Sequence, residues 1–117
     1  MKVKRSLRIS ELLKREISDI IANKVRDRLV KNIIITYVKV TDDLRYAKVY
    51  YRVLCDNPNQ DKLVAALERV TKFIRLEIGN RVQLRFVPEI HFFYDSGMDE
   101  AQRIEQLFEK IKNEQTE

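Results

Sequence analysis

The sequence predicts one α+β domain, because its 117 residues carry both helical and strand patterns and fit the usual size of a single domain. Apolar residues recur at three- and four-residue steps in residues 6–24, which is the period of an amphipathic helix. Apolar and polar residues alternate in residues 46–53, as in a half-buried strand. The chain has only two glycines and two prolines, so we expect short turns between the elements.

The first expected element is the amphipathic helix over residues 6–24. Its apolar face consists of Ile9, Leu12, Leu13, Ile17, Ile20 and Ile21. Ser6 is the expected N-cap, because its hydroxyl can accept a hydrogen bond from an otherwise unpaired backbone N–H group. A charged connection over residues 25–32 then leads to the first strand.

Two strands follow, joined by a tight connection at residues 42–45. Residues 33–41 consist largely of Ile, Val, Tyr and Thr, the residue types that favour strands. In residues 46–53, one face of the expected strand carries Ala47, Val49, Tyr51 and Val53, and the other carries Lys48, Tyr50 and Arg52. This alternation predicts a half-buried strand in an antiparallel hairpin.

A helix, a strand and a final helix are expected in the second half of the chain. Asp61 can cap the helix, whose pattern runs through Ile78 to a left-handed cap at residues 79–80. The apolar period of this helix is irregular near residues 70–72. The sequence therefore allows either one long helix or two helices with a kink between them. Residues 84–94 predict a third strand, in which Pro88 indicates an edge position or a bulge. Residues 98–112 predict the final helix.

The charge distribution favours a polyanionic partner. The net charge is +5, with Lys and Arg in excess over residues 1–15 and Asp and Glu in excess over residues 95–117. A strongly basic end is typical of proteins that bind nucleic acid. The alternative is a charged, solvated surface of the kind that heat-adapted proteins carry.

Motifs of catalysis, metal binding and membrane insertion do not occur in the sequence. His91 is the only histidine, without a CxxC or HExxH pattern, and we expect it to make a structural hydrogen bond. Asp42 and Asp43 are expected to form a turn rather than a cation site. Cys55 is the only cysteine, which agrees with a reducing cytoplasm. The longest apolar run, residues 33–35, is too short to span a bilayer. We therefore expect no enzyme, cofactor, metal, small-molecule substrate or membrane contact.

Several segments carry a more specific signal. They are Asp27-Arg28-Leu29, Thr41-Asp42-Asp43-Leu44 with Ala47-Lys48-Val49-Tyr50, Phe73-Ile74-Arg75, and Leu84-Arg85-Phe86-Val87-Pro88-Glu89-Ile90-His91-Phe92-Phe93-Tyr94-Asp95 followed by Arg103-Ile104. Together they resemble the ribosome-binding factor A family, over about residues 5–107. The string Leu-Arg-x-Val-Pro-Glu-x-x-Phe-x-x-Asp is the most specific of them.

The resemblance implies a KH type II-like fold, α-β-β-α-α-β with a C-terminal helix, in which a three-stranded sheet has its helices packed on one face. Residues 1–97 would form the RNA-binding domain, and residues 98–117 a C-terminal helix and acidic tail. The family has an Ala-x-Gly helix kink instead of the GxxG loop of ordinary KH domains. Here those positions read Val70-Thr71-Lys72, and the usual Asp-Pro-Arg-Leu reads Asp27-Arg28-Leu29 without the proline.

The resemblance also implies a function. Members bind free small ribosomal subunits and promote late maturation and processing of small-subunit ribosomal RNA, near its 5′ end and the decoding region. They matter most in the cold and perform no covalent chemistry. We accordingly expect a cytoplasmic monomer. The alternatives are a generic RNA-binding module, a protein-interaction module in which the acidic final helix docks a basic partner, and a small nuclease.

The candidate RNA-binding residues are basic, because Lys and Arg engage phosphates. They are Lys2, Lys4, Arg5, Arg8, Arg69, Lys72, Arg75, Arg81 and Arg85. For the members between residues 69 and 85, the alternative is a solvated helix face with pairs such as Arg81–Glu77. Aromatic side chains could stack on bases, but more often such residues cover the open side of a sheet or pack under a helix. The aromatic candidates are Tyr46, Tyr50 and Phe93.

Overall fold

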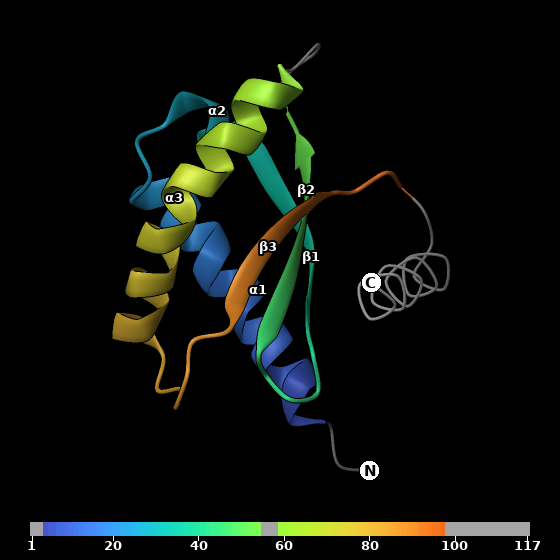
Figure 1. Ribbon diagram of the computed structural model, residues 1–117, viewed down its shortest axis with the longest axis vertical. Coiled ribbons are helices and arrows are strands. Elements are labelled where there is room, and N and C mark those ends of the chain that lie inside the picture. Colours follow the sequence, from blue (N-terminus) through green and yellow to red (C-terminus); the bar gives the residue numbers. More distant parts are fainter. Residues whose placement is uncertain (1–3, 55–58, 98–117) are drawn as a thin grey trace, which may run out of the picture.

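The computed structural model describes residues 4–54 and 59–97 (Figure 1). The elements run in the order α1 (Arg5–Asn23), α2 (Arg28–Lys31), β1 (Ile33–Val40), β2 (Tyr46–Val53), α3 (Gln60–Arg81) and β3 (Glu89–Tyr94). The predicted α+β class is confirmed. Lys2, Cys55 and the final helix expected over residues 98–112 lie outside the described residues.

The three strands form one sheet in the order β1-β2-β3. β1 and β2 are antiparallel, with Ile33 opposite Val53 and Val40 opposite Ala47, and the register shifts between Ile35 and Tyr37. β3 runs parallel to β2 at the edge of the sheet. The edge position agrees with the interpretation of Pro88, but the strand is shorter than expected, because residues 84–88 form a loop that leads into it.

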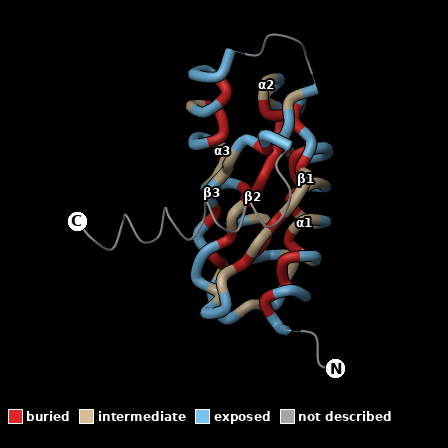
Figure 2. The backbone as a smooth tube through the Cα atoms, turned by 90° about the vertical axis from the view of Figure 1, so that its right-hand side faces the viewer, coloured by how far each residue is buried: buried red, intermediate tan, exposed pale blue. Residues whose placement is uncertain are grey.

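The helices cover one face of the sheet, as expected, and the core lies between the two layers (Figures 1 and 2). Leu13, Ile17 and Ile20 of α1 are fully buried there, as are Ile74 and Ile78 of α3. Figure 2 shows buried positions along the strands and along the inner sides of both helices. Burial of this apolar surface is the main favourable contribution to folding.

The start of α1 differs from the sequence prediction. The N-cap is Lys4, which makes no side-chain capping bond, so Ser6 lies inside the helix rather than at its cap. The Ser6 hydroxyl instead donates to Asp42 Oδ1 at 3.2 Å. One turn later, Ser10 Oγ accepts a hydrogen bond from the Val40 N–H group at 2.9 Å. Both serines are buried, and they tie α1 to the end of β1 and the turn after it.

The expected charged connection contains the short helix α2. Asp27 caps it, because Asp27 Oδ1 accepts hydrogen bonds from the N–H groups of Leu29 at 2.9 Å and Val30 at 3.4 Å. Val30 is fully buried and anchors α2 in the core. The sequence pattern missed α2 because four residues are too few to show a helical period.

α3 is one continuous helix of 22 residues, so the alternative of two separate helices is wrong for this chain. At the expected kink, Thr71 Oγ1 donates to the Leu67 carbonyl at 2.6 Å within an unbroken helix. The N-cap is Asn59 rather than Asp61, and Asn59 Oδ1 accepts from the Lys62 N–H group at 3.1 Å. The helix ends at Arg81 and leaves through Val82 in an extended conformation, so the expected left-handed cap at residues 79–80 is also wrong.

Candidate nucleic-acid interface

Three segments that are distant in the sequence meet at the lower end of the molecule in Figure 1. They are the start of α1, the β1–β2 turn and the loop between α3 and β3. Together with Arg75 of α3 they enclose a hollow of about 580 Å³. We call it the arginine groove, because its walls carry Arg5, Arg45, Arg75 and Arg85.

Each arginine reaches the groove from a different element. Arg5 is the first residue of α1, Arg45 follows Leu44 in the turn, and Arg85 lies in the loop. Leu44 has a φ of 61°, a left-handed conformation that reverses the chain tightly between β1 and β2. Arg5, Arg45 and Arg85 are all exposed, and no ion pair is found for them within residues 4–54 and 59–97.

Arg75 fastens the loop to α3. Its Nε donates to the Pro88 carbonyl at 3.2 Å, and its Nη2 donates to the Val87 carbonyl at 3.0 Å. These bonds leave its positive charge at the wall of the groove, because a carbonyl group does not neutralise a guanidinium. Arg75 therefore contributes both to the position of the loop and to the local potential.

Two carboxylates also line the groove, and each has a nearby partner. Asp43 Oδ1 accepts from Thr41 Oγ1 at 2.6 Å and from the Arg45 N–H group at 3.1 Å. The Thr41 hydroxyl first, and then the Arg45 N–H group, hold the pKa of Asp43 below its usual value. Glu89 Oε1 lies 3.2 Å from Nε2 of His91. The arginines thus outnumber the carboxylates, which makes the groove attractive to anions.

Arg81 lies in a different setting, which we call the Arg81 cluster: Arg81, Glu16, Asp19 and Glu77. Its Nη1 lies 2.6 Å from Asp19 Oδ2 and 3.2 Å from Glu16 Oε2, and its Nε lies 3.6 Å from Glu77 Oε2. Hydrogen bonds to Asp19 and Glu16 raise the pKa of Arg81, and the bond from Arg81 is the main cause of a lowered pKa at Asp19. The cluster joins α1 to α3.

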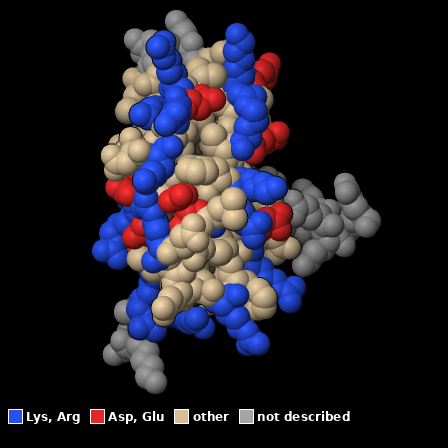
Figure 3. All heavy atoms as spheres, turned by 90° about the vertical axis from the view of Figure 1, so that its left-hand side faces the viewer, with Lys and Arg blue, Asp and Glu red and all other residues tan. Residues whose placement is uncertain are grey.

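The other candidates are spread over the surface. Lys4 lies 4.0 Å from Asp42 and Arg69 lies 3.6 Å from Asp27, in exposed or half-exposed pairs. Arg8 and Lys72 are exposed and lie outside the arginine groove. Figure 3 shows Lys and Arg side chains running along the face that carries α3, with fewer Asp and Glu between them. The structure thus brings Arg5, Arg75 and Arg85 together and adds Arg45, which was not singled out from the sequence.

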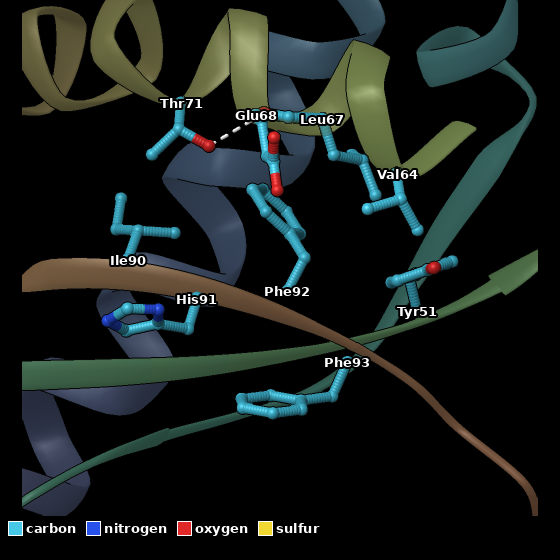
Figure 4. Close-up of a pocket in the computed structure, with 9 residues that line it drawn as sticks. All are labelled: Tyr51, Val64, Leu67, Glu68, Thr71, Ile90, His91, Phe92 and Phe93. Atoms are coloured by element: carbon cyan, nitrogen blue, oxygen red, sulfur yellow. Dashed lines mark hydrogen bonds between the residues drawn. The ribbon is translucent and has the colours of Figure 1, made fainter. Parts of the chain in front are cut away.

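A second hollow, of about 220 Å³, lies between α3 and β3 (Figure 4). Val64, Leu67 and Glu68 line it from α3, and Phe92 points toward them from β3, whereas Phe93 points away. Its described lining residues include Glu68 but neither Lys nor Arg. A phosphate backbone would gain little electrostatic attraction here, so the arginine groove is the better candidate interface.

The aromatic candidates lie on the sheet face opposite the helices. Tyr50 packs against Tyr37 and Phe93, with ring centroids 5.8 and 5.7 Å apart, and only 7% of its surface is exposed. Tyr46 is more open and lies beside His91, at a centroid distance of 6.3 Å. Tyr50 therefore agrees with the expectation that such rings cover the sheet. The most exposed aromatic ring of the described residues is Phe86, which the sequence analysis did not single out.

No group of three or more His, Cys, Asp or Glu side chains is arranged to hold a metal ion in residues 4–54 and 59–97. No helix in the same residues is long and apolar enough to cross a membrane.

Comparisons with known proteins identify the family of this chain. The family model described as Ribosome-binding factor A matches residues 5–108. A ribosome-binding factor A from Halothermothrix orenii is 43% identical over 115 residues, which cover 98% of this chain and 94% of the relative. One from Acetivibrio thermocellus is 52% identical over 101 residues, which cover 86% of this chain and 82% of the relative.

Solved structures show the same fold. The crystal structure of ribosome-binding factor A from Thermus thermophilus matches with a TM-score of 0.66 at 19% identity. The matched region covers 76% of this chain and 94% of the Thermus thermophilus chain. A homology model of the Thermus thermophilus factor, fitted into a cryo-EM map of a 30S complex of the factor, has a TM-score of 0.61 at 18% identity. The match covers 76% of this chain and 93% of the fitted chain. From the family match and the close relatives, this chain belongs to the ribosome-binding factor A family.

Proposed function

We propose that this protein binds the small ribosomal subunit through the arginine groove and promotes late maturation and processing of its ribosomal RNA without catalysis. The observation that carries the proposal is the convergence of Arg5, Arg45, Arg75 and Arg85 at one groove. Family membership and the Thermus thermophilus relative, fitted into a map of a 30S complex, support the choice of partner.

The groove suits RNA for electrostatic reasons. Arginine presents a planar fork of N–H donors that matches a phosphate group. Each phosphate that is neutralised releases condensed counterions, so affinity falls steeply as salt increases. Contacts of this kind orient a protein on RNA without reading bases, and we propose that the shape of the RNA determines where the groove docks.

The remaining parts of the proposal follow the family resemblance. Residues 1–97 act as the RNA-binding domain, with residues 98–117 as an appended helix and acidic tail. The protein acts as a cytoplasmic monomer without a cofactor or metal ion. It shifts a conformational equilibrium of the ribosomal RNA, and this help matters most in the cold, when RNA helices rearrange slowly.

Co-sedimentation with ribosomal particles tests the proposal. Purified protein is mixed with free small subunits or with full ribosomes over a series of salt concentrations, and the bound fraction is measured. We expect binding to free small subunits that weakens as salt rises, with little binding to full ribosomes. Absence of binding to small subunits, or equal binding to any RNA, would contradict an assembly role.

A charge-reversal pair locates the binding surface in the same assay. Arg85→Glu places a carboxylate in the groove, whereas Lys62→Glu makes the same charge change at an exposed position of α3 outside it. We expect Arg85→Glu to weaken binding strongly and Lys62→Glu to have little effect. Equal losses in both variants would mean that net charge, rather than the groove, determines binding.

A further inference from the structure

Phe86 is an exposed ring in a charged groove. Its side chain is 76% exposed, the largest value among the exposed apolar residues of the part of the chain that the structure describes. Single exposed apolar residues are common on protein surfaces, so it is the position of this ring in a groove lined by arginines that distinguishes it. Leu76, 62% exposed, lies on α3 outside both hollows and has no such surroundings.

The ring is placed beside groups that bind phosphates. The Arg85 guanidinium carbon lies 5.8 Å from the centroid of the Phe86 ring, within the range of a cation–π contact. Arg5 and Arg45 line the same groove from α1 and the β1–β2 turn. An aromatic face and several guanidinium groups are therefore available to one ligand, which would have to combine a flat ring system with negative charges.

The loop that carries the ring is held in position. The two hydrogen bonds from Arg75 to the Val87 and Pro88 carbonyls fasten the residues that follow Phe86 to α3. Pro88 is buried, and β3 begins directly after it. A fastened loop presents the ring in one place, which lowers the ordering cost of binding.

From these contacts we infer that Phe86 is a stacking platform for an unpaired base, so that the arginine groove takes a single-stranded RNA segment rather than a duplex. The inference rests on the proposed function and specifies the ligand of the same groove. A base can lie flat on a side chain only when it is free of its own stack, which confines this contact to loops, bulges and strand ends. The hollow of about 580 Å³ is large enough, since small-ligand pockets span roughly 300–1,000 Å³.

The chain allows a direct optical test, because it contains no tryptophan. Phe86→Trp introduces the only indole, and stacking of a base on it quenches its emission. Phe73→Trp is the matched control, since Phe73 is 39% exposed on α3 and does not line the groove. The probes are a short single-stranded RNA of mixed sequence, the duplex of the same sequence, and polyglutamate as an acidic polypeptide.

The expected result is saturable quenching of Phe86→Trp by the single strand, much weaker quenching by the duplex and none by polyglutamate, with Phe73→Trp unchanged throughout. Phe86→Ala should weaken binding of the single strand roughly tenfold, and Phe86→Tyr should restore it. Since Phe86 is exposed, both variants should keep the wild-type melting temperature. Binding of the single strand without quenching, equal quenching by the duplex or polyglutamate, or equal affinity of Phe86→Ala would overturn the inference.

Co-sedimentation with small subunits separates this inference from the proposed function. Salt-sensitive binding to free subunits together with an unquenched Phe86→Trp would leave the function standing and refute the stacking role. Absence of subunit binding by the wild type together with quenching of Phe86→Trp by the single strand would refute the proposed function and leave the stacking role standing. Absence of both would refute both.

Discussion

Arg85 and Arg81 lie close together in the sequence, yet they belong to regions with different electrostatics. In the arginine groove, Arg85 is exposed and no ion pair is found for it within residues 4–54 and 59–97. In the Arg81 cluster, one guanidinium lies within 3.6 Å of carboxylates from Glu16, Asp19 and Glu77. The first arginine can neutralise an external phosphate, whereas the second already neutralises the protein's own acids.

The comparison shows that the number of basic residues says little about where a polyanion binds. A phosphate that approached Arg81 would have to displace or tolerate three nearby carboxylates, which costs electrostatic free energy. At the arginine groove, the four guanidinium groups outnumber the carboxylates of Asp43 and Glu89, so the groove keeps an excess of positive charge. We therefore assign Arg81 to holding α1 against α3 rather than to RNA contact.

The largest expected effect comes from Arg85→Glu. It replaces a charge-assisted contact with a repulsive one, and we expect small-subunit binding to weaken roughly ten- to a hundredfold. The slope of log affinity against log salt should also become shallower by about one unit, because one phosphate contact is lost. The thermal midpoint should stay at the wild-type value. A matching loss of thermal stability would make Arg85 a structural residue and remove the contrast with Arg81.

Arg75→Met tests a residue with both roles. Loss of its bonds to the Val87 and Pro88 carbonyls should lower the free energy of unfolding by about 1 kcal/mol, as measured by urea denaturation. Binding should weaken as well, but less than in Arg85→Glu, because the charge is removed rather than reversed. Unchanged stability would show that these bonds do not hold the loop.

Arg81→Met should act on stability alone. Removal of the guanidinium leaves the carboxylates of Glu16, Asp19 and Glu77 close together, so we expect the thermal midpoint to fall by a few degrees. Subunit binding at a temperature where the variant is folded should match the wild type. Weaker binding by the folded variant would return Arg81 to the RNA interface.

The smallest expected effect is the pH dependence of the stability that the Asp19–Arg81 pair contributes. The pKa of Asp19 is lowered in the folded protein, chiefly by its hydrogen bond from Arg81, relative to an ordinary value of 3.8. A lowered folded-state pKa contributes stability above the unfolded value, and that contribution is lost as the pH falls through the folded-state value. The gap in thermal midpoint between wild type and Arg81→Met should stay constant from pH 7 to about pH 5. Below 3.8 it should narrow. A gap that persists in acid would mean that Arg81 acts through packing.

The fold was largely predictable, because its signals are local periods. The apolar period of α1 and the alternation of β2 gave the elements and their buried faces. The prediction of the N-cap failed because of a long-range contact. Ser6 has the chemistry of an N-cap, but its hydroxyl donates to Asp42, 36 residues further along the chain, and no local pattern reveals this contact. At residues 70–72 the chain has Val, Thr and Lys where the family has its kink, and the helix continues without interruption.

The candidate site was predictable by residue type but not by location. The sequence offered Glu77 as a partner of Arg81, and the structure places the two 3.6 Å apart. The carboxylates of Glu16 and Asp19, which α1 brings to Arg81, could not be predicted from local spacing. Arg45 reaches the groove because the turn at Leu44 reverses the chain beside α1, which is a tertiary event. The exposure of Phe86 likewise depends on the loop that Arg75 fastens, and no sequence period marks it.

The central claim is that the arginine groove faces ribosomal RNA, and photo-crosslinking tests it most directly. A photoreactive phenylalanine analogue is placed at Phe86 in the groove or at Phe73 on α3, and each protein is irradiated in complex with free small subunits. Crosslinks to small-subunit ribosomal RNA from position 86, with few from position 73, are the predicted result. RNA crosslinks from position 73 without any from position 86 would contradict the account.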